Sequence, residues 1–186
     1  MRITGGQMKG RLLASPKGFG IRPTSDLVRE AVFNIIGQDL SDQKVLDLFS
    51  GTGSLGLEAL SRGASCAFFV DNSQQSISLI RKNLTLLGYK GRGVIIRRDL
   101  RKRFSQDHSI LKERFGVVFL DPPYRKGLVS FWLEELSVRG PLSSGALVIA
   151  ESAGNEKFPL SLENIRMLDS RLYGDTRITI YGYGEK

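Results

Sequence analysis

The sequence predicts an α/β protein built on a doubly wound, mostly parallel β-sheet. Through the middle of the chain, short apolar runs alternate with segments of helical periodicity, which is the pattern of a parallel sheet covered by helices. Two of these runs end in unusual turns, one rich in glycine and one that contains Asp121-Pro122-Pro123-Tyr124. In sheets of this class, ligands bind at the carboxyl ends of the strands. The two turns therefore indicate where the chemistry takes place.

Apolar runs and turn signals place the individual elements. Parallel strands are expected at residues 44–49, 66–70, 94–97, 117–120 and 146–150. Helices are expected from a cap at Thr24 or Ser25 to residue 36, from the glycine-rich turn to residue 61, and at residues 73–87, 105–114 and 129–137. Beyond residue 151 the pattern alternates, which predicts an antiparallel pair at residues 166–169 and 177–181. We expect a single domain over residues 1–186, with residues 1–23 as a basic arm or hairpin.

Bulk composition limits the class of protein. The chain has 186 residues, 41% hydrophobic and 25% charged, which suits one globular domain. Its apolar runs are far shorter than the ~20 residues of a membrane helix, and the N-terminus has no apolar signal region. The one cysteine permits no internal disulfide, so we expect a cytoplasmic protein. No motif settles the oligomeric state, and a monomer is the working expectation.

The charge predicts a polyanionic partner. The net charge is +8 and the pI about 9.8. Residues 1–25 hold five basic residues and no acidic one, and residues 81–103 hold nine basic residues and one acidic one. Two such segments would suit an RNA backbone, although solvated basic faces are the alternative. The candidate RNA-binding residues are Arg2, Lys9, Arg11, Arg22, Arg98, Arg101 and Arg125.

The glycine-rich turn predicts a nucleotide-containing cofactor. Gly51, Gly53 and Gly56 satisfy the G-x-G-x-x-G pattern, and Asp71 follows Gly51 by twenty residues at the end of the next strand. This is the dinucleotide fingerprint in its expected context, and the missing lysine after the glycines excludes a triphosphate P-loop. Asp47 would crowd a pyrophosphate, however, and suits the amino group of the methionine moiety of S-adenosylmethionine.

Two further acids extend this cofactor hypothesis. Asp71 would accept from both ribose hydroxyls, and Asp99 would accept from the adenine amino group, although a neighbouring arginine is an equal alternative partner for Asp99. The predicted cofactor site comprises Asp47, Phe49, Gly51, Gly53, Asp71, Asn72, Asp99 and Leu100.

The turn after residues 117–120 predicts a binding site for an exocyclic amine. The carboxylate of Asp121 and the carbonyl of Pro122 are two acceptors for an NH2 group, and the Tyr124 ring is a surface on which a flipped base stacks. Accepting hydrogen bonds from that NH2 favours a pyramidal nitrogen, and the sulfonium donor leaves as a neutral thioether that needs no acid. Asp121, Pro122 and Tyr124 are therefore the candidate catalytic residues, against the alternative of a plain proline-rich turn.

Taken together, the motifs resemble those of the RsmD family of 16S rRNA guanine-N2 methyltransferases, within the class I S-adenosylmethionine-dependent enzymes. The resemblance covers nearly the whole chain and rests on Arg2-Ile3, Gly5-Gly6, Lys9-Gly10-Arg11, Arg22-Pro23-Thr24, Asp26, Val28-Arg29-Glu30, Asp47 to Gly53, Leu55 to Ala64, Asp121 to Tyr124 and Tyr173 to Thr176. It implies a Rossmann-like seven-stranded sheet of order 3-2-1-4-5-7-6 with strand seven antiparallel. It also implies an assembling small ribosomal subunit as substrate. Ser50 and Tyr124 are mild departures from the family pattern.

Other chemistries remain as alternatives or are excluded. An adenine-N6 methyltransferase acting on DNA or RNA would use the same turn, so the choice of guanine rests on the resemblance alone. A catalytically silent RNA-binding assembly factor and a nicotinamide oxidoreductase are the further alternatives. Carbon-5 methylation of pyrimidines needs a cysteine nucleophile, and Cys66 starts a buried strand. His108 is the sole histidine, and no Cys/His cluster predicts a metal site.

Overall fold

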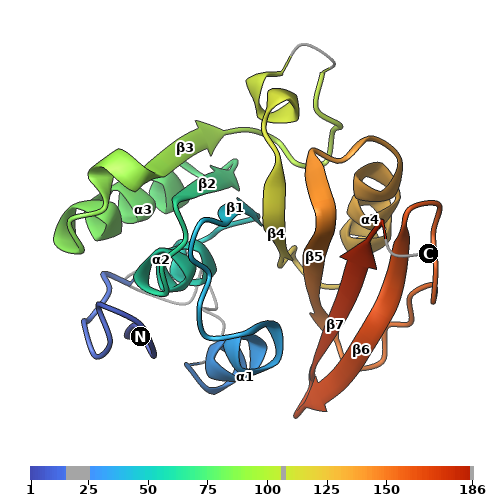
Figure 1. The fold of residues 1–186 in the computed structure, drawn as a ribbon, viewed down its shortest axis with the longest axis horizontal. Helices are drawn as coiled ribbons and strands as arrows, with labels where there is room; N and C mark the ends of the chain where they lie inside the picture. The colour runs from blue at the N-terminus through green and yellow to red at the C-terminus, as the bar shows by residue number, and fades with distance from the viewer. Residues whose placement is uncertain (16–25, 106–107, 185–186) are drawn as a thin grey trace. The chain divides into compact units, whose positions relative to one another are not determined.

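The computed structural model describes residues 1–15, 26–105 and 108–184 (Figure 1). The chain divides into two compact units, Met1–Leu100 and Arg101–Lys186, called here the first and second units. The RNA-binding candidate Arg22 and the helix-capping candidates Thr24 and Ser25 lie outside the described residues. The expectation of a single domain stays a prediction.

The first unit contains a three-stranded parallel sheet. Its elements are α1 (Asp26–Ile36), β1 (Lys44–Leu48), α2 (Ser54–Ser61), β2 (Cys66–Asp71), α3 (Gln74–Leu86), the 3-10 helix η1 (Lys90–Arg92) and β3 (Gly93–Arg97). β2 pairs with both neighbours in parallel, with Asp47 opposite Phe69 and Asp71 opposite Arg97. The apolar runs of β1 and β2 are largely buried, whereas β3 is only partly buried; a short apolar run in each strand nevertheless located it to within a residue or two.

Local signals start the two helices that follow the strands of this unit. Ser73 caps α3, since its Oγ accepts a hydrogen bond from the Ser76 N–H at 3.3 Å. α2 begins after Gly53, whose φ of 78° is the left-handed conformation that glycine adopts without strain. Both helices therefore begin directly behind a strand end, and both start at the edge where the acidic residues lie.

The second unit combines parallel and antiparallel pairing. Its elements are the 3-10 helix η2 (Ser109–Lys112), β4 (Phe115–Leu120), α4 (Leu128–Arg139), β5 (Leu142–Ala153), β6 (Ile165–Tyr173) and β7 (Thr176–Tyr183). β4 pairs with β5 in parallel, whereas β7 is antiparallel to both β5 and β6.

Two expected elements of the second unit differ from the structure. The helix predicted at residues 105–114 is only η2, capped by His108, whose Nδ1 accepts from the Ile110 N–H at 3.3 Å. The fifth strand was predicted to end at residue 150, but β5 continues to Ala153. There Glu151 pairs with Ile178 and Ala153 with Thr176 on β7, so backbone pairing extends a strand whose side chains have turned polar.

The strand order is β3-β2-β1-β4-β5-β7-β6, with β7 antiparallel. This confirms the predicted Rossmann-like seven-stranded sheet and its order. Among the helices of the described residues, none has the length and apolar character needed to cross a membrane.

Candidate functional site

The turn that follows β1 is a tight loop held in left-handed backbone conformations. Phe49, Gly51 and Gly53 have φ values of 61°, 54° and 78°. The Gly53 N–H donates to the Ser50 carbonyl at 2.7 Å, and the Ser50 N–H donates to the Val70 carbonyl at 3.1 Å. A left-handed phenylalanine is costly, and such strain gathers at functional sites. The turn is therefore fixed before any ligand binds.

Asp47 is a buried carboxylate beside this turn. It is 2% exposed, and its Oδ2 accepts a hydrogen bond from the Gly56 N–H at 3.0 Å. A Cβ at Gly56 would lie 2.4 Å from Phe69 Cε1, so glycine is needed for α2 to come close enough to donate this bond. Burial raises the pKa of Asp47 to about 7. A buried carboxylate with so little compensation suits a ligand that carries a positive charge.

Asp71 holds the turn from the end of β2. Its Oδ2 accepts from the Gly51 N–H at 2.9 Å, and its Oδ1 accepts from the Ser73 N–H at 2.8 Å. A carboxylate oxygen can accept more than one hydrogen bond, so Asp71 retains the capacity to accept hydrogen bonds from the hydroxyl groups of a ligand. Asp71 thus joins the glycine turn to the start of α3.

The remaining cofactor candidates follow β2 and β3. Asn72 is exposed, and its carbonyl accepts from Arg97 Nε at 3.2 Å. Asp99 is half-buried and Leu100 is 2% exposed, and the two lie just past the end of β3. Because β1, β2 and β3 are parallel neighbours, Asp47, Asp71 and Asp99 come to one edge of the first unit's sheet.

The N-terminal residues form a small hairpin clamped to α2. Arg2 bridges Leu12 in antiparallel fashion, and the Ile3 N–H donates to the Arg11 carbonyl at 2.9 Å. Glu58, fully buried on α2, accepts from the Thr4 N–H at 2.8 Å and from the Gly5 N–H at 2.7 Å. The RNA-binding candidates Arg2, Lys9 and Arg11 are exposed on this hairpin.

Two buried arginines complete the Glu58 cluster. Arg29 Nε lies 3.2 Å from Glu58 Oε2, and Arg62 Nη2 lies 2.8 Å from Glu58 Oε1. Arg29 also binds Asp26 Oδ1 at 2.8 Å and the Arg2 carbonyl. Arg29 therefore braces the hairpin against α1. Sequence reasoning did not single out Glu58, whose partners become visible only in the fold.

In the second unit, the structure fixes the Tyr124 ring. The Tyr124 hydroxyl donates to Glu151 Oε1 at 2.9 Å and shares a hydrogen bond with Thr176 Oγ1 at 3.2 Å. Burial raises the pKa of Tyr124 to about 12, so the phenol stays neutral. In the same turn, Asp121 is half-buried and Pro122 is buried. The ring is thus held in place beside the predicted acceptors.

Glu151 and Thr176 are contacts that sequence reasoning missed. Glu151 is 9% exposed and directly follows the apolar run at residues 146–150. That is the same signal, an acid at the end of a buried strand, that identified Asp71 and Asp121. Glu156 was missed as well; its Oε1 accepts from the Arg125 N–H at 3.3 Å, and Arg125 has a φ of 60°.

Two of the last RNA-binding candidates, Arg98 and Arg101, lie at the boundary between the units in the sequence, and Arg125 lies in the turn after β4. Arg98 is half-buried, and its N–H donates to the Asp71 carbonyl at 2.9 Å. Arg101 and Arg125 are exposed.

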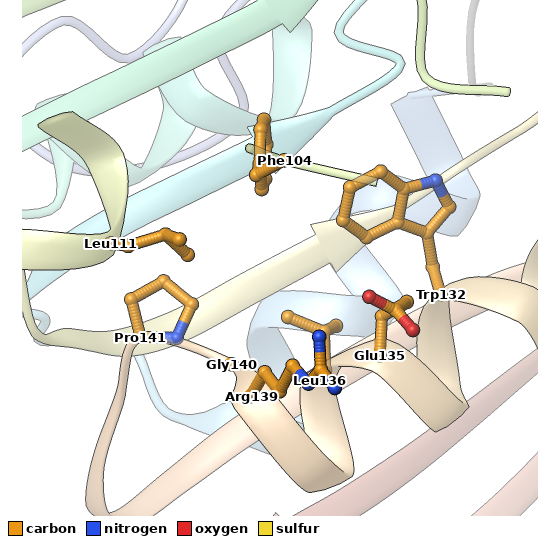
Figure 2. Close-up of a pocket in the computed structure, with 8 residues that line it drawn as sticks. All are labelled: Phe104, Leu111, Trp132, Glu135, Leu136, Arg139, Gly140 and Pro141. Carbon is orange, nitrogen blue, oxygen red and sulfur yellow. The ribbon is translucent and has the colours of Figure 1, made fainter. Parts of the chain in front are cut away.

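Figure 2 shows a pocket of the second unit that none of the residues of the Tyr124 turn lines. Its walls include Phe104 and Trp132, whose ring centroids are 5.0 Å apart, and Pro141. The Phe115 N–H donates to the Pro141 carbonyl at 2.8 Å, so the pocket lies where β4 begins, whereas Asp121 follows the end of that strand. Trp132 is 2% exposed, and we interpret the pocket as a crevice over the core.

The fold is that of the Rossmann-like methyltransferases. An RNA methyltransferase from Salinibacter ruber, solved in complex with S-adenosyl-L-homocysteine, superposes with a TM-score of 0.64 at 18% identity, over 89% of this chain and 95% of that one. At that identity the likeness concerns the fold alone.

The chain belongs to the family described as Conserved hypothetical protein 95, whose model matches residues 1–182. It is 33% identical to the Ribosomal RNA small subunit methyltransferase D of Escherichia coli, over 97% of this chain and 89% of that protein. The protein of the same name from Haemophilus influenzae is 31% identical over 97% and 93%. The solved structure of the Escherichia coli protein yhhF is 33% identical, with a TM-score of 0.82 over 98% of this chain and 97% of that one. These likenesses confirm the predicted resemblance to the RsmD family.

Proposed function

We propose that this protein transfers a methyl group from S-adenosylmethionine to the exocyclic N2 amine of a guanine in small-subunit ribosomal RNA. The observation that carries the proposal is the Asp121 to Tyr124 turn, with the Tyr124 hydroxyl anchored on Glu151, in a chain of this family. The names of the Escherichia coli and Haemophilus influenzae relatives support ribosomal RNA as the substrate.

In this proposal the turn after β1 binds the methyl donor. Asp47 receives the ammonium group of the methionine moiety, a positive charge that offsets the cost of keeping this carboxylate ionised in a buried site. Asp71 accepts from the ribose hydroxyls while it continues to hold Gly51. Asp99 accepts from the adenine amino group, and the buried Leu100 packs beside it.

The turn after β4 binds the amine. The lone pair of the guanine amine is delocalised into the ring, so the amine is a poor nucleophile. Asp121 and the Pro122 carbonyl accept its two N–H bonds, which directs the lone pair at the methyl carbon. S-adenosylmethionine, when bound, would supply an electrophilic methyl group and depart as a neutral thioether, and Asp121 or water would take the proton that the amine nitrogen loses. Alignment of this kind can contribute up to about 7–11 kcal/mol for well-oriented reactants, and Asp121 stabilises the positive charge that develops on nitrogen.

The exposed cations are proposed to bind the RNA. Arg2, Lys9 and Arg11 on the hairpin, with Arg101 and Arg125 in the second unit, neutralise phosphates of an assembling small subunit. The proposal further includes a cytoplasmic location and a monomeric enzyme.

Replacing Asp121 tests the chemistry. The protein is incubated with methyl-labelled S-adenosylmethionine and either assembled or partly assembled small subunits. We expect Asp121→Ala to lower the transfer rate by at least about 100-fold, because it removes an acceptor used in the transition state. The affinity for S-adenosylhomocysteine and the salt-sensitive binding of rRNA should stay within about twofold of the wild type. Full activity in the variant would remove Asp121 from the mechanism.

The same assay separates the alternatives. Label found only in adenosine, or only in duplex DNA, would favour the adenine-N6 alternative. RNA binding without any transfer by the wild-type protein would favour an assembly factor that has lost catalysis.

A further inference from the structure

Two long stretches of the first unit contain no acidic residue. No aspartate or glutamate occurs in residues 1–25, and none occurs in residues 72–98, between Asp71 and Asp99. The second stretch covers the whole of α3, which carries Arg81 and Lys82 on its exposed side. Each stretch by itself is a run of charge, and such a run is often only a solvated face.

The structure joins these two stretches through Asn83. Asn83 is fully buried on α3, where its Oδ1 accepts from the Ala14 N–H at 2.7 Å and its Nδ2 donates to the Ala14 carbonyl at 3.2 Å. Nδ2 also donates to the Thr52 carbonyl, in the glycine turn, at 3.2 Å. The end of the N-terminal hairpin is therefore attached to α3 by a two-way amide contact.

The basic residues of the first unit include two groups with different surroundings. Arg29 and Arg62 are buried on Glu58, and Arg92 donates to the Leu60 and Ala64 carbonyls. In contrast, four exposed cations of the hairpin and α3 make no ion pair with any other described residue. These four are Lys9, Arg11, Arg81 and Lys82. The first group holds the fold together, whereas the second keeps its charge at the surface.

We infer that the hairpin and α3 together form an extended RNA-backbone docking surface, in which Arg81 and Lys82 are phosphate-binding residues and Asn83 holds the two parts together. The inference rests on the proposed function, since it assigns further residues to the binding of the same RNA. Charge complementarity selects the partner: unpaired cations with no acid nearby in the chain are what phosphate binding requires, because each contact releases condensed counterions. The surface carries no sequence readout and positions the RNA.

Salt dependence of binding tests this surface. The probe is deproteinised small-subunit rRNA, and affinities are measured over a range of salt concentrations for the wild type and for the double variant Arg81→Gln/Lys82→Gln. Each phosphate contact contributes roughly 0.7–0.9 to the slope of log K against log salt. We therefore expect the variant's slope to be shallower by about 1.5, with at least tenfold weaker binding at low salt.

A matched control removes two charges from the second unit. Arg139→Gln/Lys157→Gln changes the net charge equally at exposed positions and should leave the slope at the wild-type value. Both double variants should keep the wild-type melting temperature and affinity for S-adenosylhomocysteine. An unchanged slope for Arg81→Gln/Lys82→Gln, or equal losses in the two variants, would overturn the inference. Methyl transfer by the wild type is measured in parallel and tests the proposed function separately. A wild type that transfers no methyl group would still bind RNA with a measurable salt dependence, so the two failures can be told apart.

Discussion

Asp47 and Glu58 are two buried carboxylates of the first unit with opposite surroundings. Glu58 is enclosed by two arginines, by the backbone N–H groups of Thr4 and Gly5, and by the Thr4 hydroxyl at 2.9 Å. Asp47 accepts one backbone hydrogen bond, from Gly56, and the nearby charge of Asp71 further disfavours its ionised form. The two residues lie on consecutive elements, β1 and α2, yet only one of them is compensated.

We propose that this difference separates a structural carboxylate, Glu58, from a ligand-binding one, Asp47. A buried charge is costly unless ion pairs and hydrogen bonds compensate it. For Glu58 the protein supplies that compensation itself, so the carboxylate fastens the hairpin to α2. For Asp47 it does not, and strong perturbation of a buried acid beside a strained turn is typical of functional sites. This contrast supports the proposal that the partner of Asp47 is the ammonium group of the ligand.

Removing Glu58 should have the largest effect on stability. Glu58→Ala leaves Arg29 and Arg62 buried without their shared partner, and we expect a loss of about 3–5 kcal/mol in the free energy of unfolding. Urea titration measures it, and Glu58→Gln, which preserves shape, is the control that isolates the charge. A loss below about 1 kcal/mol would mean that the hairpin does not depend on this cluster.

Replacing Asp47 should raise the free energy of unfolding, whereas replacing Glu58 should lower it. Asp47→Asn keeps an acceptor for the Gly56 N–H and removes the buried charge, so we expect a gain of about 1–2 kcal/mol in stability above pH 7. The same change should weaken S-adenosylhomocysteine by at least tenfold, because the partner of its ammonium group is lost. Calorimetric titration and thermal unfolding measure the two effects. Destabilisation together with unchanged ligand affinity would make Asp47 a structural residue like Glu58.

The smallest expected effect is a difference between wild type and Asp47→Asn in how the free energy of unfolding depends on pH. The pKa of Asp47 is raised from 3.8 to about 7 in the folded protein. Between these values the folded state holds a proton that the unfolded state has lost, so this group's contribution to stability falls as pH rises from about 4 to about 7. The difference in unfolding free energy between variant and wild type should therefore grow over that window and level off above it. A difference that is flat with pH would contradict the raised pKa.

Strand ends could be predicted from the sequence because the signal is local. Apolar runs closed by Asp71 or Asp121 locate both the strand and the strand end at which the proposed site lies. The same rule failed at β5, where the strand continues past Ala150 through buried polar residues. The side chain of Glu151 accepts a hydrogen bond from the Tyr124 hydroxyl, and its backbone pairs with β7. Both partners are distant in the sequence, so the residues next to Glu151 do not predict these contacts.

The compensated carboxylate could not be predicted for a related reason. The Thr4 N–H and Glu58 are 54 residues apart, and Tyr124 and Thr176 are 52 residues apart. Residue types alone do not distinguish Glu58 from Asp47, since both are acids near apolar residues. Only the fold determines which acid contacts two arginines and which contacts a single backbone N–H.

The most direct test of the central claim is to map modified nucleosides by mass spectrometry in small-subunit rRNA, from cells that carry this gene and from cells that lack it. The account predicts that one N2-methylguanosine disappears with the gene and returns on incubation with the wild-type protein and S-adenosylmethionine, but not with Asp121→Ala. Loss of an N6-methyladenosine instead, or an unchanged set of modified nucleosides, would contradict it.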